Sequence, residues 1–425
     1  MLPNLTYINI VLTLIYFTCS ILYFKRVISW ISSNIFFFSH SYFFNIIFLG
    51  NSYVDTTNKT FIFSQFLILL FLIGLFIGSA ANCIIPKRKI LYQYIKSRKT
   101  YIKIKNEWIL AIILLYILNV WVTGQINPLD QLFIGFRNSL TNFYSKGAGY
   151  IAIPIKSLCF ILSTLFIGKL IYRKKLLYGF IVLICYLTIA IGTGSRGYIL
   201  FILIAYLLIL LYRYHVKFYY KFLIVISIVA FSPILLSIRG WYKITVENIL
   251  SSYEFFFTAL SFRGDTIIAL NDMLEYLKKL PFNYHFYSIY TLLFKPFPSY
   301  ILSIKPKNIE LILNESIYGY NDVTPYSTSF GGIGEWYLNF DVVGVLIYGI
   351  LVGFFLFYFE KKITQSIKLN SLKGPLILSI IPLYNIEHIG ISSTTVSYLL
   401  VFLLLTIFLA QTLRIKYSRQ RIADG

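Results

Sequence analysis

Three arginines, each followed directly by a glycine, are the residues whose type and spacing point most clearly to chemistry. They are Arg196-Gly197, Arg239-Gly240 and Arg263-Gly264. The guanidinium group is a rigid fork of hydrogen-bond donors that matches phosphate oxygens, and a neighbouring glycine lets a bulky anion approach the backbone. These arginines are therefore candidates for binding a phosphate group. The alternative is that each one only anchors a helix end among lipid headgroups.

A single carboxylate, Glu335, stands among glycines just before an apolar segment. The passage reads Gly331-Gly332-Ile333-Gly334-Glu335-Trp336. Glycines at such a place can hold a substrate close, and the carboxylate could accept the proton of a sugar hydroxyl or bind sugar hydroxyls. The alternative is an ordinary helix start with its aromatic residues at the membrane interface. His285 is a second candidate base, and its alternative is a surface or packed imidazole.

Other signatures of chemistry are missing from the sequence. It has no Asp-x-Asp pair for a divalent cation, no Gly-rich phosphate loop ending in Lys, and no His/Cys metal set. We therefore predict no metal and no cofactor, and we do not expect nucleotide-sugar donors or coupling to ATP. The apolar segments also lack the series of buried charges that an ion-driven pump needs.

The composition identifies the solvent around this chain as a lipid bilayer. Of its 425 residues, 58% are hydrophobic and only 13% are charged, whereas soluble proteins carry about 25% charged residues. The net charge of +22 would suit nucleic acid, but most of the 38 basic residues fall in short runs between apolar segments. Such runs are typical of cytoplasmic loops. We predict an all-α polytopic membrane protein with no nucleic-acid partner.

A membrane-spanning helix needs about 20 mostly apolar residues, and eleven segments qualify, with 10 or 12 helices as alternatives. They are Tyr7–Phe24, Ile28–Gly50, Phe61–Ile84, Trp108–Gly124, Tyr150–Tyr172, Leu176–Thr193, Tyr198–Tyr214, Phe222–Ile238, Trp336–Phe359, Pro375–Ile391 and Val396–Thr412. The weakest is Ile28–Gly50, because it contains polar residues such as Asn34 and His40. Whether it spans the membrane or lies in the interface is open at this point.

The basic runs define the orientation, because cytoplasmic loops carry an excess of Lys and Arg. Five such runs fall on one side of the membrane when the crossings are counted, around Lys96, Arg173, Lys217, Lys368 and Arg419. Lys25 and Arg26 join them if Ile28–Gly50 spans. The C-terminus is then cytoplasmic.

One large loop, residues 239–335, lies on the outer side and holds more than half of the 16 acidic residues. Long loops are usually functional. We predict two or more helices within it, with helical periodicity over Val246–Leu260 and over Thr266–Leu280, forming a cap over a cavity that opens to the membrane. The chain thus divides into residues 1–238 with about eight membrane helices, the loop 239–335, and residues 336–425 with about three helices and a basic tail.

The three arginines all fall on the outer side, where the positive-inside tendency works against them. A phosphate ligand at the outer face of a membrane points to a lipid-linked pyrophosphate. We expect Arg196, Arg239 and Arg263 to converge on one such group.

These features together resemble the Wzy-type oligosaccharide repeat-unit polymerases, the O-antigen or capsule polymerases of bacterial inner membranes. The resemblance is carried by the Gly194-Ser195-Arg196-Gly197 hairpin, the Arg239-Gly240 helix exit, the single large outer loop, and the passage Thr324-Pro325 … Gly334-Glu335-Trp336-Tyr337-Leu338-Asn339-Phe340 … Gly344. It implies a GT-C-like architecture and a metal-independent glycosyltransferase. Such an enzyme would move a glycan from undecaprenyl pyrophosphate onto a new lipid-linked repeat unit at the periplasmic face.

Two related activities and one partner stay open at this stage. An O-antigen ligase would have a similar architecture, and a lipid-linked oligosaccharide flippase would have shorter loops and internal repeats. A chain-length regulator could be a partner beside the lipid-linked donor and acceptor and the membrane lipids. The sugars joined, the linkage and the oligomeric state do not follow from the sequence.

Overall fold

The structure is a computed structural model that describes part of the chain. The described residues are 3–48, 58–84, 114, 149–192, 196–214, 265–278, 285–294, 306–307, 309–319 and 330–379. Helices and short turns account for this part of the chain, and it contains no strand. The all-α prediction is confirmed there. The predicted spans Trp108–Gly124, Phe222–Ile238, Pro375–Ile391 and Val396–Thr412 lie wholly or largely outside the described residues.

Contacts divide the chain into two compact units. Unit 1 comprises Met1–Lys87, Leu250–Lys361 and Tyr384–Ser393, and unit 2 comprises Arg88–Ile249, Lys362–Leu383 and Thr394–Gly425. This grouping cuts across the predicted boundaries at residues 238 and 335, because helices far apart in sequence pack together. The three-part division along the membrane topology stays a prediction.

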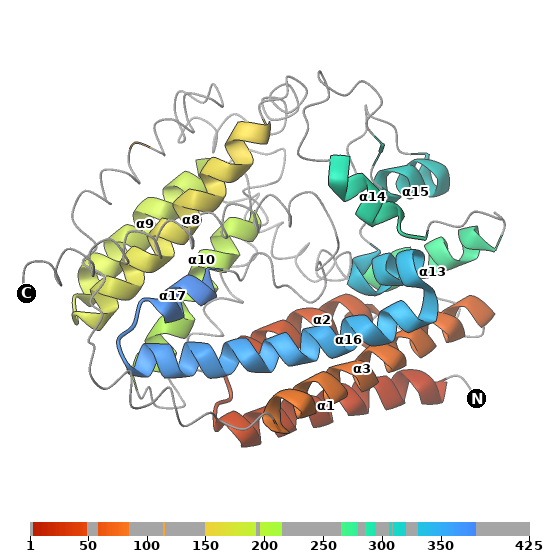
Figure 1. Cartoon of the computed structure of the whole chain (residues 1–425), viewed down its shortest axis with the longest axis horizontal. Coiled ribbons are helices and arrows are strands. Elements are labelled where there is room, and N and C mark those ends of the chain that lie inside the picture. The colour runs from red at the N-terminus through yellow and green to blue at the C-terminus, as the bar shows by residue number, and fades with distance from the viewer. Residues whose placement is uncertain are drawn as a thin grey trace, which may run out of the picture. The chain divides into compact units, whose positions relative to one another are not determined.

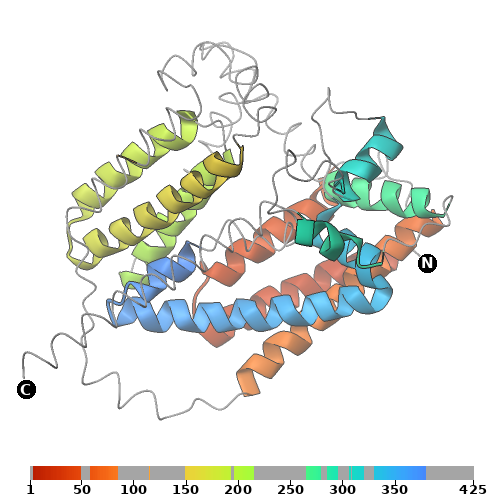
Figure 2. The ribbon, with the colours of Figure 1, turned by 45° about the horizontal axis from the view of Figure 1, so that its top comes forward.

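The described residues of unit 1 form four long helices and three shorter ones. They are α1 (Pro3–Phe24), α2 (Trp30–Phe48), α3 (Lys59–Ile84), α13 (Asp265–Leu277), α14 (Tyr287–Phe294), α15 (Ile309–Tyr318) and α16 (Gly331–Lys368) up to Lys361. The four long helices lie alongside one another (Figure 1, Figure 2). By length and composition, α1, α3 and α16 are able to cross a membrane. A helix suits that role because it satisfies its own backbone polar groups.

Helices α3 and α16 approach closely through two Gly-x-x-x-Gly sequences that face each other. A Cβ on Gly74 or Gly78 would collide with the backbone carbonyls of Leu346 or Ile350, and one on Gly349 would collide with that of Phe71. Small residues at this spacing let two membrane helices touch backbone to backbone. The spacing is visible in the sequence, although the close contact was not predicted from it.

The side-chain contacts show the direction of each helix in unit 1. Asn9 of α1 donates to Gln65 of α3 at 2.9 Å, and Tyr16 of α1 bonds Ser79 of α3 at 2.8 Å. Residue numbers therefore rise together, and α1 and α3 run parallel. A chain that runs through two parallel helices must return between them, and α2 makes that return. The segment Ile28–Gly50, whose role was open, therefore traverses unit 1 as α2 despite its polar residues.

Two charged side chains make hydrogen bonds at the end of unit 1 at which α1 and α3 end. Glu360 of α16, which is fully buried, accepts a hydrogen bond from the backbone N–H of Trp30 at the start of α2. A carboxylate at a helix N-terminus complements the helix dipole. Lys361 donates to the backbone and side-chain oxygens of Asn82 in the last turn of α3, at 2.7 and 2.8 Å. The residues that the predicted topology places near the basic, cytoplasmic loops therefore lie at one end of unit 1.

The three shorter helices belong to the predicted outer loop. Helix α13 confirms the periodicity over Thr266–Leu280, but it ends at Leu277, before the predicted end at Leu280. It packs against α2 and α3, and Lys278 beyond its end donates to Thr60 in the first turn of α3. The outer helices therefore lie at the end of unit 1 opposite Lys361. The predicted helix Val246–Leu260 lies outside the described residues.

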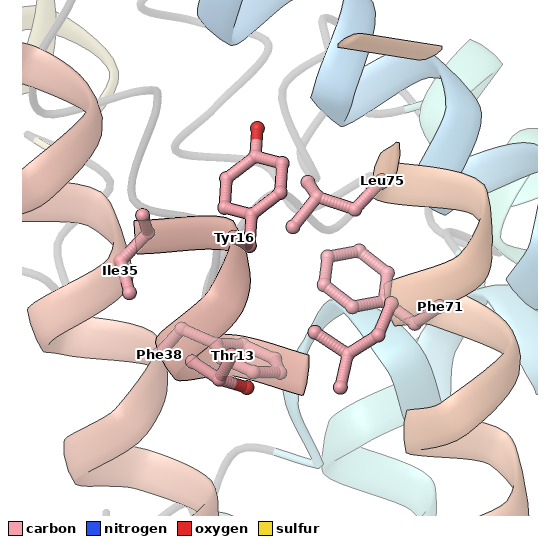
Figure 3. Close-up of a pocket in the computed structure, with 7 residues that line it drawn as sticks. Thr13, Tyr16, Ile35, Phe38, Phe71 and Leu75 are labelled. Atoms are coloured by element: carbon pink, nitrogen blue, oxygen red, sulfur yellow. The ribbon is translucent and has the colours of Figure 1, made fainter. Parts of the chain in front are cut away.

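A small cavity of ≈ 10 Å³ lies among α1, α2 and α3 (Figure 3). Its lining residues are Thr13, Tyr16, Ile35, Phe38, Phe71, Leu72 and Leu75. The two hydroxyls among them are occupied, since Thr13 donates to the Asn9 carbonyl and Tyr16 bonds Ser79. A void of this size and apolar character is too small and dry for a substrate. It is a packing defect rather than the predicted cavity beneath the outer loop.

Unit 2 contains α8 (Gly149–Tyr172), α9 (Leu176–Gly192), α10 (Arg196–Arg213), the end of α16 and α17 (Lys373–Leu378). A tight turn with a positive φ at Lys174 joins α8 to α9. The hydroxyl of Tyr172 donates to the Ser371 carbonyl at 3.2 Å, and that of Tyr214 donates to the Ile171 carbonyl at 3.0 Å. Three predicted cytoplasmic loops thus meet at one end of unit 2, as their basic residues require.

The glycine contact between α3 and α16 leads to a first prediction. We expect Gly349→Ala to lower the stability of unit 1 by about 1–3 kcal/mol, because the added methyl must displace backbone rather than a side chain. Gly179→Ala is the matched control, since the atoms nearest to its Cβ lie at 3.8 Å and need not move. Thermal unfolding of the purified protein in detergent measures the difference. Equal melting temperatures for the two variants would contradict the close backbone contact.

Candidate active site

Glu335 lies inside α16 rather than before it. The helix begins at Gly331, where φ is +69°, so the predicted start at Trp336 was too late. Phe330 is buried directly before the helix, and the Glu335 side chain is only 6% exposed. A buried carboxylate in a helix that is able to cross a membrane is costly and is often functional.

The glycines around Glu335 make room for protein, not for a substrate. A Cβ on Gly332 would meet the hydroxyl of Tyr348. One on Gly334 would lie 2.9 Å from Cβ of Phe330 and 3.2 Å from Cδ1 of Leu270 in α13. The idea that these glycines let a substrate approach Glu335 is therefore wrong at both positions, because helix packing already fills that space.

Asn339, one turn after Glu335, joins α16 to the segment that leads into α14. Its Nδ2 donates to the Glu335 carbonyl at 2.7 Å and to the Ser288 hydroxyl at 2.9 Å. Its Oδ1 accepts from the Ser288 backbone N–H at 2.9 Å, and its own carbonyl accepts from the Phe286 N–H at 3.3 Å. Buried polar side chains with all partners in place stabilise one arrangement. This role was not predicted from the sequence, although a polar residue near an apolar span is a signal for such a role.

The Asn339 bridge brings the two predicted bases to one region of unit 1. His285 directly precedes Phe286, whose N–H bonds Asn339, while Glu335 presents its carbonyl to the same side chain. The two candidates differ in environment, since Glu335 is buried and His285 is exposed. The sequence could not pair them, because 50 residues separate them along the chain.

Asp341 breaks α16 just beyond this bridge. Its φ of 59° and ψ of −158° are not helical, so α16 is two helical segments joined at this residue. Its Oδ1 accepts a hydrogen bond from the Val342 N–H at 2.9 Å. Only glycine adopts this conformation readily, and other residues pay about 1–3 kcal/mol for it. The sequence does not predict the break, because neither proline nor glycine stands at this position.

Asp272 on α13 is a third carboxylate at this end of unit 1, and its contacts mark it as structural. Burial raises the pKa of its carboxyl group, while the hydrogen bond from the Tyr318 hydroxyl at 2.7 Å acts in the opposite direction. That bond ties α13 to α15. Asp272 therefore has a structural role in holding these two helices together.

Comparison with known families decides the identity of the chain. The model of the family described as O-antigen polysaccharide polymerase Wzy matches residues 2–418, which is nearly the whole chain. The chain belongs to the Wzy family of O-antigen polysaccharide polymerases. Neither the curated proteins nor the solved structures contain a match. The predicted resemblance is confirmed, and nothing supports the ligase or flippase alternatives.

Membership of the Wzy family establishes the general activity and setting. The protein is a multi-pass membrane enzyme that polymerises lipid-linked oligosaccharide repeat units in polysaccharide biosynthesis. Its candidate site residues in unit 1 are Glu335 and His285, to which the structure adds Asn339 and Asp341.

The predicted pyrophosphate-binding arginines are only partly placed for this Wzy protein. Arg196 is the first residue of α10 in unit 2, but its side chain lies outside what the structure describes. Arg239 and Arg263 also lie outside the described residues. Their convergence on one ligand stays a prediction. Among the described residues, no group of three or more His, Cys, Asp and Glu side chains is placed to hold a metal ion.

Proposed function

We propose that this Wzy protein works at the periplasmic face of the bacterial inner membrane and uses undecaprenyl pyrophosphate as the carrier of its glycan donor. One observation supports the face. Lys361 caps the last turn of α3 at the basic end of unit 1, whereas Lys278 contacts Thr60 in its first turn. The outer helices thus occupy the end opposite the basic loops. Glu335 and Asn339 stand at the start of α16, and α16 reaches the basic end at Lys361.

The reaction joins a hydroxyl of the new repeat unit to the sugar at the reducing end of the growing glycan. The hydroxyl oxygen attacks the anomeric carbon, and the bond from that carbon to the pyrophosphate oxygen breaks. Undecaprenyl pyrophosphate leaves with the bonding electrons. The hydroxyl proton passes to a base, for which Glu335 is the first choice and His285 the second.

The charges of the protein match this leaving group. A pyrophosphate ester leaves as a stable anion, so it needs cationic stabilisation more than a strong general acid. We assign that role to Arg196, Arg239 and Arg263, and we propose that the reaction needs no metal. Asn339 positions the base region through its bonds to Ser288 and to the Glu335 carbonyl.

Reconstitution tests the proposed donor. We expect the purified protein in lipid nanodiscs to convert undecaprenyl-pyrophosphate-linked repeat units into longer lipid-linked glycans and free undecaprenyl pyrophosphate. Nucleotide sugars alone should give no product, and a chelator should not stop the reaction. Mass spectrometry of the lipid products follows both outcomes. Dependence on a nucleotide sugar or on an added divalent metal would refute the proposed donor chemistry.

A further inference from the structure

Two residues with strained backbone lie in the region where the start of α14 meets α16. Phe286 has φ of +61° and Asp341 has φ of +59°. The Phe286 N–H bonds the carbonyl of Asn339, two residues before Asp341, and the rings of Phe286 and Phe340 meet edge to face at 5.2 Å. A positive φ at a bulky residue is a genuine outlier and persists only where the surroundings enforce it.

This strain presents side chains to the outside instead of burying them. Phe286 is 59% exposed, and Asp341 is exposed as well. Packing of these two side chains in a core therefore does not explain the strain. Strained positions of this kind cluster at ligand sites, where the backbone holds a group ready for binding.

Aromatic residues follow Phe286 into α14 at a spacing of four. Residues four apart on a helix are neighbours, and this aromatic row consists of the exposed Phe286 and Tyr290 and the half-buried Phe294. Tyr290 is 50% exposed, and its ring lies 4.8 Å from that of Phe294. The Tyr290 N–H bonds the Phe286 carbonyl at 2.9 Å, so the row begins at the strained residue. Exposed aromatic rings offer a large apolar surface next to polar groups.

We propose that Phe286, Tyr290 and Asp341 form a subsite for one sugar ring of the glycan. The aromatic rings cover the apolar C–H face of the sugar, and Oδ2 of Asp341 accepts hydrogen bonds from its hydroxyls. Oδ1 of Asp341 accepts a hydrogen bond from the Val342 N–H, which restrains the orientation of the carboxylate. The subsite rests on the proposed function in one respect, namely that this end of unit 1 faces the glycan.

Exposed aromatic rings can contact either a sugar or a lipid headgroup, and the charge of Asp341 favours the sugar. Tyrosine and phenylalanine are also common at membrane interfaces. A carboxylate repels headgroup phosphates, however, whereas it accepts strong hydrogen bonds from neutral hydroxyls. The exposed imidazole of His285, next to Phe286, adds another group suited to hydroxyls.

Binding of the free repeat-unit oligosaccharide, released from its lipid and pyrophosphate, tests the subsite. The full-length protein in nanodiscs is titrated with this oligosaccharide by calorimetry. We expect Tyr290→Phe to bind like the wild type, and Tyr290→Leu, which keeps apolarity but loses the ring, to bind about tenfold more weakly. Leu311→Ala, on the exposed surface of α15, is the control that keeps full binding. Equal affinities for the Leu and Phe variants would mean that the rings only anchor the protein in the membrane interface.

Asp341→Gly tests the role of the carboxylate separately from the role of the strained backbone at this position. Glycine adopts a positive φ without strain, so the variant should melt at the same or a higher temperature while binding the oligosaccharide more weakly. Full affinity and full polymerisation by Asp341→Gly would overturn the proposal and leave the break in α16 purely structural. A wild-type protein that polymerises lipid-linked units without binding free oligosaccharide would overturn the subsite alone. Loss of polymerisation from the lipid-linked donor would instead refute the proposed function.

Discussion

Replacing Arg196, Arg239 or Arg263 with alanine is expected to lower the rate of polymerisation by about 100-fold or more. Each guanidinium is assigned to the pyrophosphate, on which negative charge grows as the glycosidic bond breaks. Lysine at the same position keeps the charge but loses the bidentate fork, so it should restore only part of the activity. The variants are expressed at normal membrane levels in a strain that lacks its own polymerase, and the lipopolysaccharide ladder is compared.

Arg173→Ala is the matched control for these variants. Arg173 lies in the tight turn between α8 and α9 on the predicted cytoplasmic side, and its backbone N–H closes that turn through the Lys169 carbonyl, independently of its side chain. We expect a full ladder from this variant. If all three outer alanine variants also build the full ladder, the pyrophosphate clamp is wrong, and these arginines only anchor helix ends among headgroups.

Glu335→Gln is expected to lower the turnover rate by about 100-fold to 10,000-fold, which is the range for loss of a general base. Glutamine has nearly the same shape, and the Asn339 bond goes to the backbone carbonyl of residue 335, which the substitution keeps. The fold should therefore persist, as thermal unfolding can verify. The reconstituted assay should show a fall in kcat with little change in KM, because the effect falls on the transition state.

Two further variants decide between the candidate bases. Glu315→Gln on α15 serves as the control. It removes an exposed ion pair with Lys307 and should keep full activity. His285→Ala should lose only a few-fold in rate if Glu335 is the base, since general-base loss costs about 100-fold or more. The reverse pattern, with Glu335→Gln active and His285→Ala inactive, would transfer the role of base to His285.

Much of the helical architecture was predictable from local sequence. Apolar runs of bilayer length predict the helices observed as α1, α3 and α16. The helical periodicity after Arg263 predicts α13 to within a few residues. The basic loops predict one orientation, and the bonds that Tyr172 and Tyr214 make at the basic end of unit 2 agree with it. These features follow from hydropathy, charge and period, which belong to each segment alone.

The site was predicted less completely. Glu335 and His285 were selected by residue type, but their common neighbour Asn339 was not, since its partners Ser288 and Phe286 are about 50 positions away. The glycines around Glu335 were read as space for a substrate, whereas Tyr348 and Leu270 occupy that space. Which atoms fill a gap depends on helices that pack together from distant parts of the chain.

The sequence by itself determined that this chain is a membrane protein and to which family it belongs, and it predicts which side its loops face. Only the tertiary structure decided that α2 returns between the parallel helices α1 and α3. It alone showed that α16 breaks at Asp341 and that Asn339 holds α14 there. The physical reason is that hydropathy acts on each segment separately, whereas direction, strain and hydrogen-bond partners arise from contacts between segments. Helices form in the bilayer because they satisfy their own backbone polar groups, and close packing then determines which helices lie side by side.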